Sequence, residues 1–191
     1  MLRVLVIDEI EARAGEICAG LALAGHQVAA LLPTSANLSR QVEEISPDVI
    51  LIQTDSPSRD TLEHLAAVNE SAPRPVVMFT QKSGSALMRK AFKAGVSAYV
   101  VDGFKRERLK PLIELAIARF EEHQELKQER DDATQKLADR KLIDRAKGVL
   151  MKARGMDEDT AYAALRKLAM DRGQPLAKAA SDVVEMAKVL L

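Results

Sequence analysis

Two groups of side chains have types and spacings that could carry chemistry, and the first group is acidic or polar. Its members follow short apolar runs in the first half of the chain. They are Asp8, Glu9, Gln53, Asp55, Thr80 and Asp102. Carboxylate oxygens bind hard cations such as Mg²⁺, so Asp8 and Glu9 could hold a magnesium ion weakly. No set of His, Cys or acidic residues has the spacing of a dedicated metal site, and we expect no tightly bound metal and no cofactor.

The second group is basic and lies in residues 140–170. Residues 136–172 contain ten cations and six acids, whereas residues 1–55 contain three cations and eight acids. This asymmetry predicts an acidic front module and a back module that meets an anion. On a helical wheel of residues 140–154, cations border both sides of an apolar arc. They are Arg140, Lys147 and Arg154 on one side and Lys141, Arg145 and Lys152 on the other.

The front module must position the acidic group, and its pattern alternates between strands and helices. Apolar runs rich in β-branched residues predict strands at 2–7, 28–32, 49–52, 76–79 and 97–101. Helical periodicity predicts helices at 11–23, 39–45, 61–68 and 85–93. Short connections between fully apolar strands favour an α/β fold with one five-stranded parallel sheet and helices on both faces. The acidic group then lies at the carboxyl ends of the strands, where such sheets carry their functional crevice.

A long helix from about residue 110 to 154 follows, with Gly148 as its only glycine. Leu126, Ala133 and Leu137 fall on one face, which predicts a short parallel coiled coil and a homodimer. The alternative is a solvated spacer. Beyond it, Gly155 suits the end of a helix and Asp157 the N-cap of the next. Apolar stripes on three successive helices predict a small three-helix bundle.

Composition excludes several classes of protein. Aromatic residues make up 3% of the 191 residues and there is no Trp, so stacking on aromatics is not expected as the main mode of recognition. The single Cys18 cannot form an internal disulfide. No signal peptide and no apolar run of the roughly 18 residues needed to cross a membrane is seen, so we expect a cytoplasmic protein. There is no glycine-rich phosphate loop and no nucleophile–base pair, and we do not expect an enzyme.

The front module resembles a response-regulator receiver domain. The resemblance rests on the Asp8-Glu9 pair, on PDVILI before the end of the third strand and on Thr80 after the fourth. It implies an acid pair for Mg²⁺, a phosphoacceptor Asp after the third strand and a Lys after the fifth. Here the acceptor position, four residues before Pro57, holds Gln53, and glutamine cannot form an acyl phosphate. Asp102 replaces the Lys.

Asp55 is the alternative phosphoacceptor, but it lies two residues beyond the acceptor position. We therefore interpret the acidic pocket as a relic. The expected control is a protein–protein contact at the receiver-like module, and not phosphorylation.

The back module closely resembles the ANTAR domain, an RNA-binding antitermination module. RKLIDRAKGVLM, Gly155 and AYAALRKLAM follow one another in the order and spacing of that family. The predicted domains are a receiver-like domain at 1–118, a connecting helix at 119–136 and an ANTAR domain at 137–191. The segments DSPSRDTLEHL and AYVVDG resemble the nitrate-responsive NasT subgroup, which implies control by a nitrate/nitrite sensor protein of the NasS type.

The resemblance implies binding of hairpins in a nascent mRNA leader, which favours transcription past a terminator. We predict RNA contacts from Arg140, Lys147, Arg166 and Lys167. Ala146 and Gly148 would allow the RNA to approach closely, and Tyr162 either stacks on a base or packs on the core. One alternative is a phosphorylation-driven two-component regulator whose output domain binds DNA, although the tail lacks an obvious recognition helix. Another is an interaction adaptor that binds no nucleic acid.

Overall fold

The computed structural model describes residues 1–82, 84–101 and 103–190, and the side chains through Lys188. Asp102, a predicted pocket residue, lies outside the described residues. The chain divides into two compact units, Met1–Gln124 and Glu125–Leu191. The long helix contributes to both units, which are described separately below.

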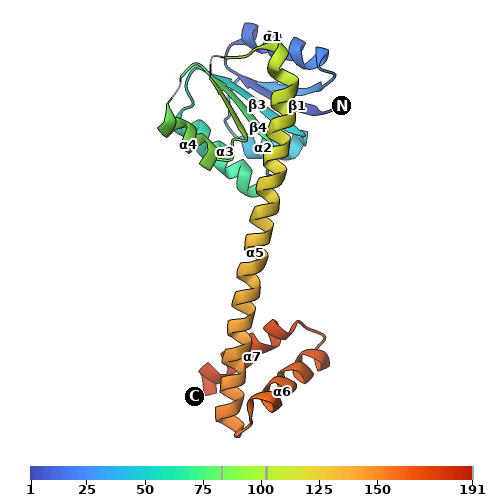
Figure 1. Cartoon of the computed structure of the whole chain (residues 1–191), viewed down its shortest axis with the longest axis vertical. Helices are drawn as coiled ribbons and strands as arrows, with labels where there is room; N and C mark the ends of the chain where they lie inside the picture. The colour runs from blue at the N-terminus through green and yellow to red at the C-terminus, as the bar shows by residue number, and fades with distance from the viewer. Residues whose placement is uncertain (83, 102, 191) are drawn as a thin grey trace. The chain divides into compact units, whose positions relative to one another are not determined.

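The first unit contains the predicted parallel sheet (Figure 1). The strands are β1 (Arg3–Asp8), β2 (Gln27–Leu32), β3 (Val49–Thr54), β4 (Val76–Thr80) and β5 (Ala98–Val101), in the order β2-β1-β3-β4-β5. The helices are α1 (Glu11–Leu23), α2 (Leu38–Ile45), α3 (Arg59–Ser71) and α4 (Ser85–Lys93). The short helix η1 (Arg106–Arg108) then leads into α5 (Leu109–Arg154).

Two apolar layers sandwich the sheet because side chains alternate along each strand. On one face, Ile50, Ile52 and Met78 pack against buried residues of α2, α3 and α4. On the other face, Leu51 and Phe79 pack against α1 and the beginning of α5. The predicted α/β fold class is therefore confirmed, with helices on both faces of the sheet.

The second unit packs the last part of α5 against α6 (Glu158–Asp171) and α7 (Leu176–Leu190). Its core contains Ala146 of α5, Leu165 of α6, and Ala180 and Val184 of α7. The predicted three-helix bundle is therefore confirmed. The turn between α5 and α6 also follows the prediction: Gly155 has a φ of 64°, and the Asp157 carboxylate accepts a hydrogen bond of 2.7 Å from the Thr160 amide.

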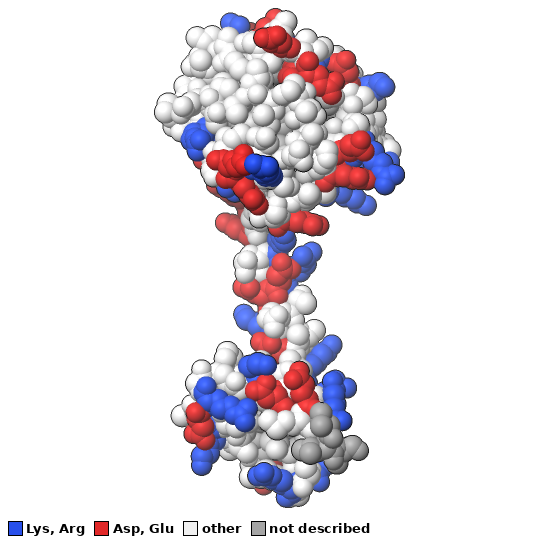
Figure 2. Space-filling view, turned by 180° about the vertical axis from the view of Figure 1, so that it is seen from behind, with Lys and Arg blue, Asp and Glu red and all other residues white. Residues whose placement is uncertain are grey.

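The helix α5 has 46 residues, and its middle part is rich in charged side chains. Cations and acids alternate along its exposed surface (Figure 2). Leu126 and Leu137, from the predicted seam, are 59% and 55% exposed. Among the described residues, no helix is long and apolar enough to cross a membrane.

Candidate functional site

The receiver-like pocket forms where β1, β3 and β4 end side by side. Asp8 lies opposite Gln53 across the β1–β3 pair, and Thr54 lies opposite Thr80 across the β3–β4 pair. Asp8, Gln53 and Thr80 are 3%, 5% and 1% exposed. Parallel pairing thus brings together residues far apart in the sequence, as predicted, and buries them.

Arg13 is the residue of this pocket that sequence reasoning missed. Its Nε donates to both carboxylate oxygens of Asp8, at 3.1 and 2.9 Å, and its Nη2 donates to Asp8 Oδ1 at 2.8 Å. Its Nη1 donates to Asp55 Oδ1 at 2.7 Å. One guanidinium therefore bridges two carboxylates from the ends of different strands. We call this arrangement the Arg13 bridge.

The bridge places a fixed positive charge against Asp8, the acid that was predicted to bind Mg²⁺. The Asp8 side chain is fully buried, the Arg13 side chain is 20% exposed and the Asp55 side chain is 70% exposed. Hydrogen bonding to Asp8, the largest influence, raises the pKa of Arg13 above its ordinary value, although burial opposes this. Among the described residues, no group of three or more His, Cys, Asp or Glu side chains could hold a metal ion.

Asp55 is also held through its backbone. Its carbonyl accepts hydrogen bonds from Thr80 Oγ1 at 3.1 Å and from the Lys82 amide at 3.2 Å. Gln53 Oε1 is buried without a hydrogen-bond donor among the described residues. Glu9, in contrast, is exposed. The acid pair predicted for Mg²⁺ is therefore split, with Asp8 engaged by Arg13 and Glu9 facing solvent.

In the second unit, most predicted RNA contacts are open to solvent. Arg140, Arg166 and Lys167 are exposed, and Tyr162 is 44% exposed. Tyr162 and Arg166 are one turn apart and share a face of α6. Gly148 is half-buried, and a Cβ added there would meet no atom within 4 Å. A side chain at this position would therefore occupy open space beside the bundle.

Lys147 is placed differently from the other cations. Its Nζ lies 2.8 Å from Asp144 Oδ1 and 2.7 Å from Glu158 Oε1, and its side chain is 15% exposed. Hydrogen bonding to Asp144 and then to Glu158 raises the pKa of Lys147. Because Glu158 belongs to α6, Lys147 joins α5 to α6. We call this arrangement the Lys147 clamp.

One prediction for this unit is wrong. Ala146 is 0% exposed and belongs to the bundle core, so it cannot permit a close approach of RNA. The helical wheel places it in the apolar arc, and that arc faces α6 and α7.

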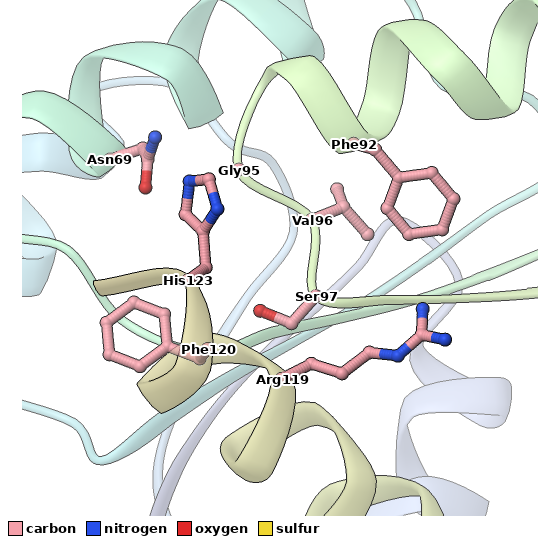
Figure 3. A pocket seen from close by; sticks show the side chains of 8 residues that line it. All are labelled: Asn69, Phe92, Gly95, Val96, Ser97, Arg119, Phe120 and His123. Atoms are coloured by element: carbon pink, nitrogen blue, oxygen red, sulfur yellow. The ribbon is translucent and has the colours of Figure 1, made fainter. Parts of the chain in front are cut away.

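A separate cavity of about 250 Å³ lies at the amino end of β5 (Figure 3). Phe120 and His123 of α5 line it together with Asn69 of α3. Gly95 closes one side, where an added Cβ would come within 2.7 Å of the Asn69 side chain. The Asn69 side chain is thus packed closely against the backbone of Gly95 at this side of the cavity.

The fold defines a class of architecture: a receiver-like α/β unit followed by a small helical bundle. The ANTAR domain family matches residues 131–184. The transcriptional regulatory protein PdtaR of Mycobacterium tuberculosis is 34% identical over 139 residues, which cover 73% of this chain and 68% of PdtaR. The nitrate regulatory protein of Klebsiella oxytoca is 40% identical over 82 residues, 43% of this chain and 19% of that protein.

Several of the similar solved structures are receiver domains. One, from a modulated diguanylate cyclase of Desulfovibrio desulfuricans, has a TM-score of 0.56 at 18% identity and covers 64% of this chain and 98% of that one. Another, from the response regulator NarL of Mycobacterium tuberculosis, has a TM-score of 0.54 at 22% identity and covers 60% and 95%. At such identities the likeness concerns the fold alone. The ANTAR match and the similarity to PdtaR show that the chain belongs to the ANTAR-domain family of transcriptional regulators.

Proposed function

We propose that the chain is a transcription antiterminator that binds hairpins in a nascent mRNA leader through its second unit. The ANTAR match over residues 131–184 supports an RNA-directed output. Hairpin loops present unpaired bases to side chains and phosphates to cations. Binding would stabilise the hairpins at the expense of a terminator, so that the polymerase continues.

The observation that carries this proposal is the exposed face of α6. Tyr162 and Arg166 project from this face, with Lys167 beside them, and all three are exposed. An aromatic ring next to a guanidinium suits an unstacked base flanked by phosphates. Arg140 adds an exposed cation on α5.

Lys147 and Gly148 take secondary places in this proposal. A phosphate would have to displace Asp144 and Glu158 before it could bind Lys147, because the Lys147 clamp already satisfies that ammonium. Gly148 leaves open space beside the bundle, into which RNA backbone could fit. We therefore expect Arg166, Lys167 and Arg140 to contribute more to affinity than Lys147.

Control by a protein partner, and not by phosphorylation, is the second part of the proposal. A glutamine stands at the acceptor position, and the Arg13 bridge already supplies the cation of the pocket. The resemblance to the nitrate-responsive subgroup favours a nitrate/nitrite sensor protein of the NasS type as the partner. The similarity to the Klebsiella oxytoca nitrate regulatory protein, over 82 residues, agrees with a role in nitrate or nitrite assimilation.

A homodimer through α5 completes the proposal. Leu126 and Leu137 are more than half exposed and lie eleven residues apart, so they fall on one face of the helix with Ala133 between them. Two chains that pair along this seam would cover both leucines and present two bundles to two hairpins.

A gel-shift titration tests the RNA contacts. RNA that copurifies with the chain is crosslinked and sequenced, and the recovered hairpin is titrated with the native chain, Arg166→Ala/Lys167→Ala and the control Arg89→Ala. The control removes an exposed cation of α4, which belongs to the first unit and lies outside the ANTAR match. The double variant should bind at least about tenfold more weakly, with a salt slope smaller by about 1.4, since each phosphate contact adds roughly 0.7. Equal affinities of the double variant and the control would refute the proposal.

A further inference from the structure

A groove between α3 and α4 offers a second recognition surface on the first unit. Its volume is about 550 Å³. Half-buried apolar side chains form its floor: Leu62 and Ala66 from α3, and Leu87 from α4. Pro57 and Ala94 also line it and are buried. A surface groove with such a floor is suited to receive apolar side chains from another molecule.

The rim of the groove is positively charged. Arg59, Lys90 and Lys93 line it, together with one acid, Glu63. Glu63 is already paired with Arg59, at 2.6 Å. Within residues 1–82, 84–101 and 103–190, neither Lys90 nor Lys93 forms an ion pair. The groove therefore carries a net positive charge over an apolar floor.

We propose that the α3–α4 groove docks an acidic amphipathic helix of a partner protein. Apolar side chains of the partner, one turn apart, would enter the groove above Leu62 and Leu87, and acidic side chains beside them would pair with Lys90 and Lys93. This inference deepens the proposed control by a protein partner, because it assigns the surface and the chemistry of that contact.

The composition of α4 favours a protein over RNA as the occupant. The exposed aromatic side chain of α4, Phe92, does not line the groove but the cavity at the amino end of β5, beside Val96 and Ser97 (Figure 3). The groove thus lacks a ring on which a base could stack. RNA phosphates placed over Leu62, Ala66 and Leu87 would lose contact with water and find no hydrogen-bond donor on this apolar surface.

Fluorescence anisotropy of a synthetic peptide tests the proposal with the full chain. The probe is a labelled helical peptide with leucines at positions i, i+3, i+4 and i+7 and glutamates elsewhere. A matched peptide carries lysines in place of the glutamates. The variants are Lys90→Glu/Lys93→Glu and the control Arg89→Glu, which reverses an exposed charge of α4 that does not line the groove.

The native chain should bind the glutamate peptide and not the lysine peptide. Lys90→Glu/Lys93→Glu should weaken binding by about tenfold or more, because two attractive rim contacts become repulsive. Arg89→Glu should change it by less than about twofold. Unlabelled chain at high concentration and hairpin RNA serve as competitors, and displacement of the peptide by either would overturn the proposal.

Binding of both peptides, or equal loss in both variants, would also overturn it. Circular dichroism is used to check that the variants are folded. RNA affinity is measured on the same proteins and should be unchanged by Lys90→Glu/Lys93→Glu. The peptide measurement then tests docking in the groove, and the RNA measurement tests RNA binding, so that failure of one proposal is distinguished from failure of the other.

Discussion

Replacing Arg13 with alanine should destabilise the first unit by about 3 kcal/mol. Breaking a buried ion pair by removing one partner costs roughly 3–5 kcal/mol, because the remaining charge is left without compensation. Asp8 is such a charge, since its side chain is fully buried. Two features place the cost at the lower end: Arg13 is 20% exposed, and the Ile10 amide still donates to Asp8 at 2.9 Å.

The two arms of the Arg13 bridge should contribute unequally. Asp55 is 70% exposed, so its arm resembles a surface pair worth about 0–1 kcal/mol. Asp55→Asn should therefore cost less than about 1 kcal/mol. Arg13→Lys keeps the charge but loses the planar fork that reaches two carboxylates, and its cost should fall between those of the other two variants.

Hydrogen-exchange mass spectrometry measures these costs in each unit separately. Peptides from β1 and β3 report on the first unit, and peptides from α6 and α7 serve as an internal control in the same molecule. Arg13→Ala should accelerate the slowest exchange of β1 and β3 and leave α6 and α7 unchanged. If β1 and β3 exchanged as in the native chain, or if Asp55→Asn cost as much as Arg13→Ala, the reasoning about the bridge would be refuted.

Three further predictions address phosphorylation, dimerisation and pH. Acetyl phosphate with Mg²⁺ should leave the intact mass unchanged, because Gln53 cannot accept a phosphoryl group; a stoichiometric adduct on Asp55 would contradict this. Leu126→Glu/Leu137→Glu should convert a dimer into a monomer in light scattering, since it places acids on the proposed seam, whereas the exposed control Glu129→Gln should stay dimeric. Hydrogen bonds from Thr160 hold the pKa of Asp157 below its ordinary value, so the stability that this cap gives α6 is complete above about pH 4 and is lost as the pH falls through the lower folded-state pKa. Circular dichroism of Asp157→Asn, which keeps a capping oxygen, should show a smaller loss of helix in acid than the native chain.

Local pattern was enough to predict most of the fold. The bounds predicted for α1 and α4 agree with the structure, because apolar periodicity ends at Gly25 and Gly95, which both have positive φ. Parallel pairing then follows from short connections between fully apolar strands. The gathering of Asp8, Gln53 and Thr80 at one edge was predictable for the same reason.

The partners of single side chains were not predictable in this way. Arg13 and Asp55 are 42 residues apart and meet only because β1 pairs with β3. The one signal in the sequence was a cation in the first turn of the helix after the acid pair. Lys147 lies eleven residues from Glu158 across a turn, so a helical wheel of α5 alone could not show the clamp. The same wheel placed Ala146 in the apolar arc but did not reveal that α6 and α7 cover it completely.

Single-round transcription on a template with the recovered leader and its terminator tests the central claim most directly. The native chain should raise the fraction of transcripts that pass the terminator, in proportion to its occupancy of the hairpin RNA. Arg166→Ala/Lys167→Ala should leave that fraction at the level without protein, whereas Arg89→Ala should act as the native chain does. Unchanged readthrough with the native chain, or equal stimulation by the Arg166→Ala/Lys167→Ala variant, would contradict the account.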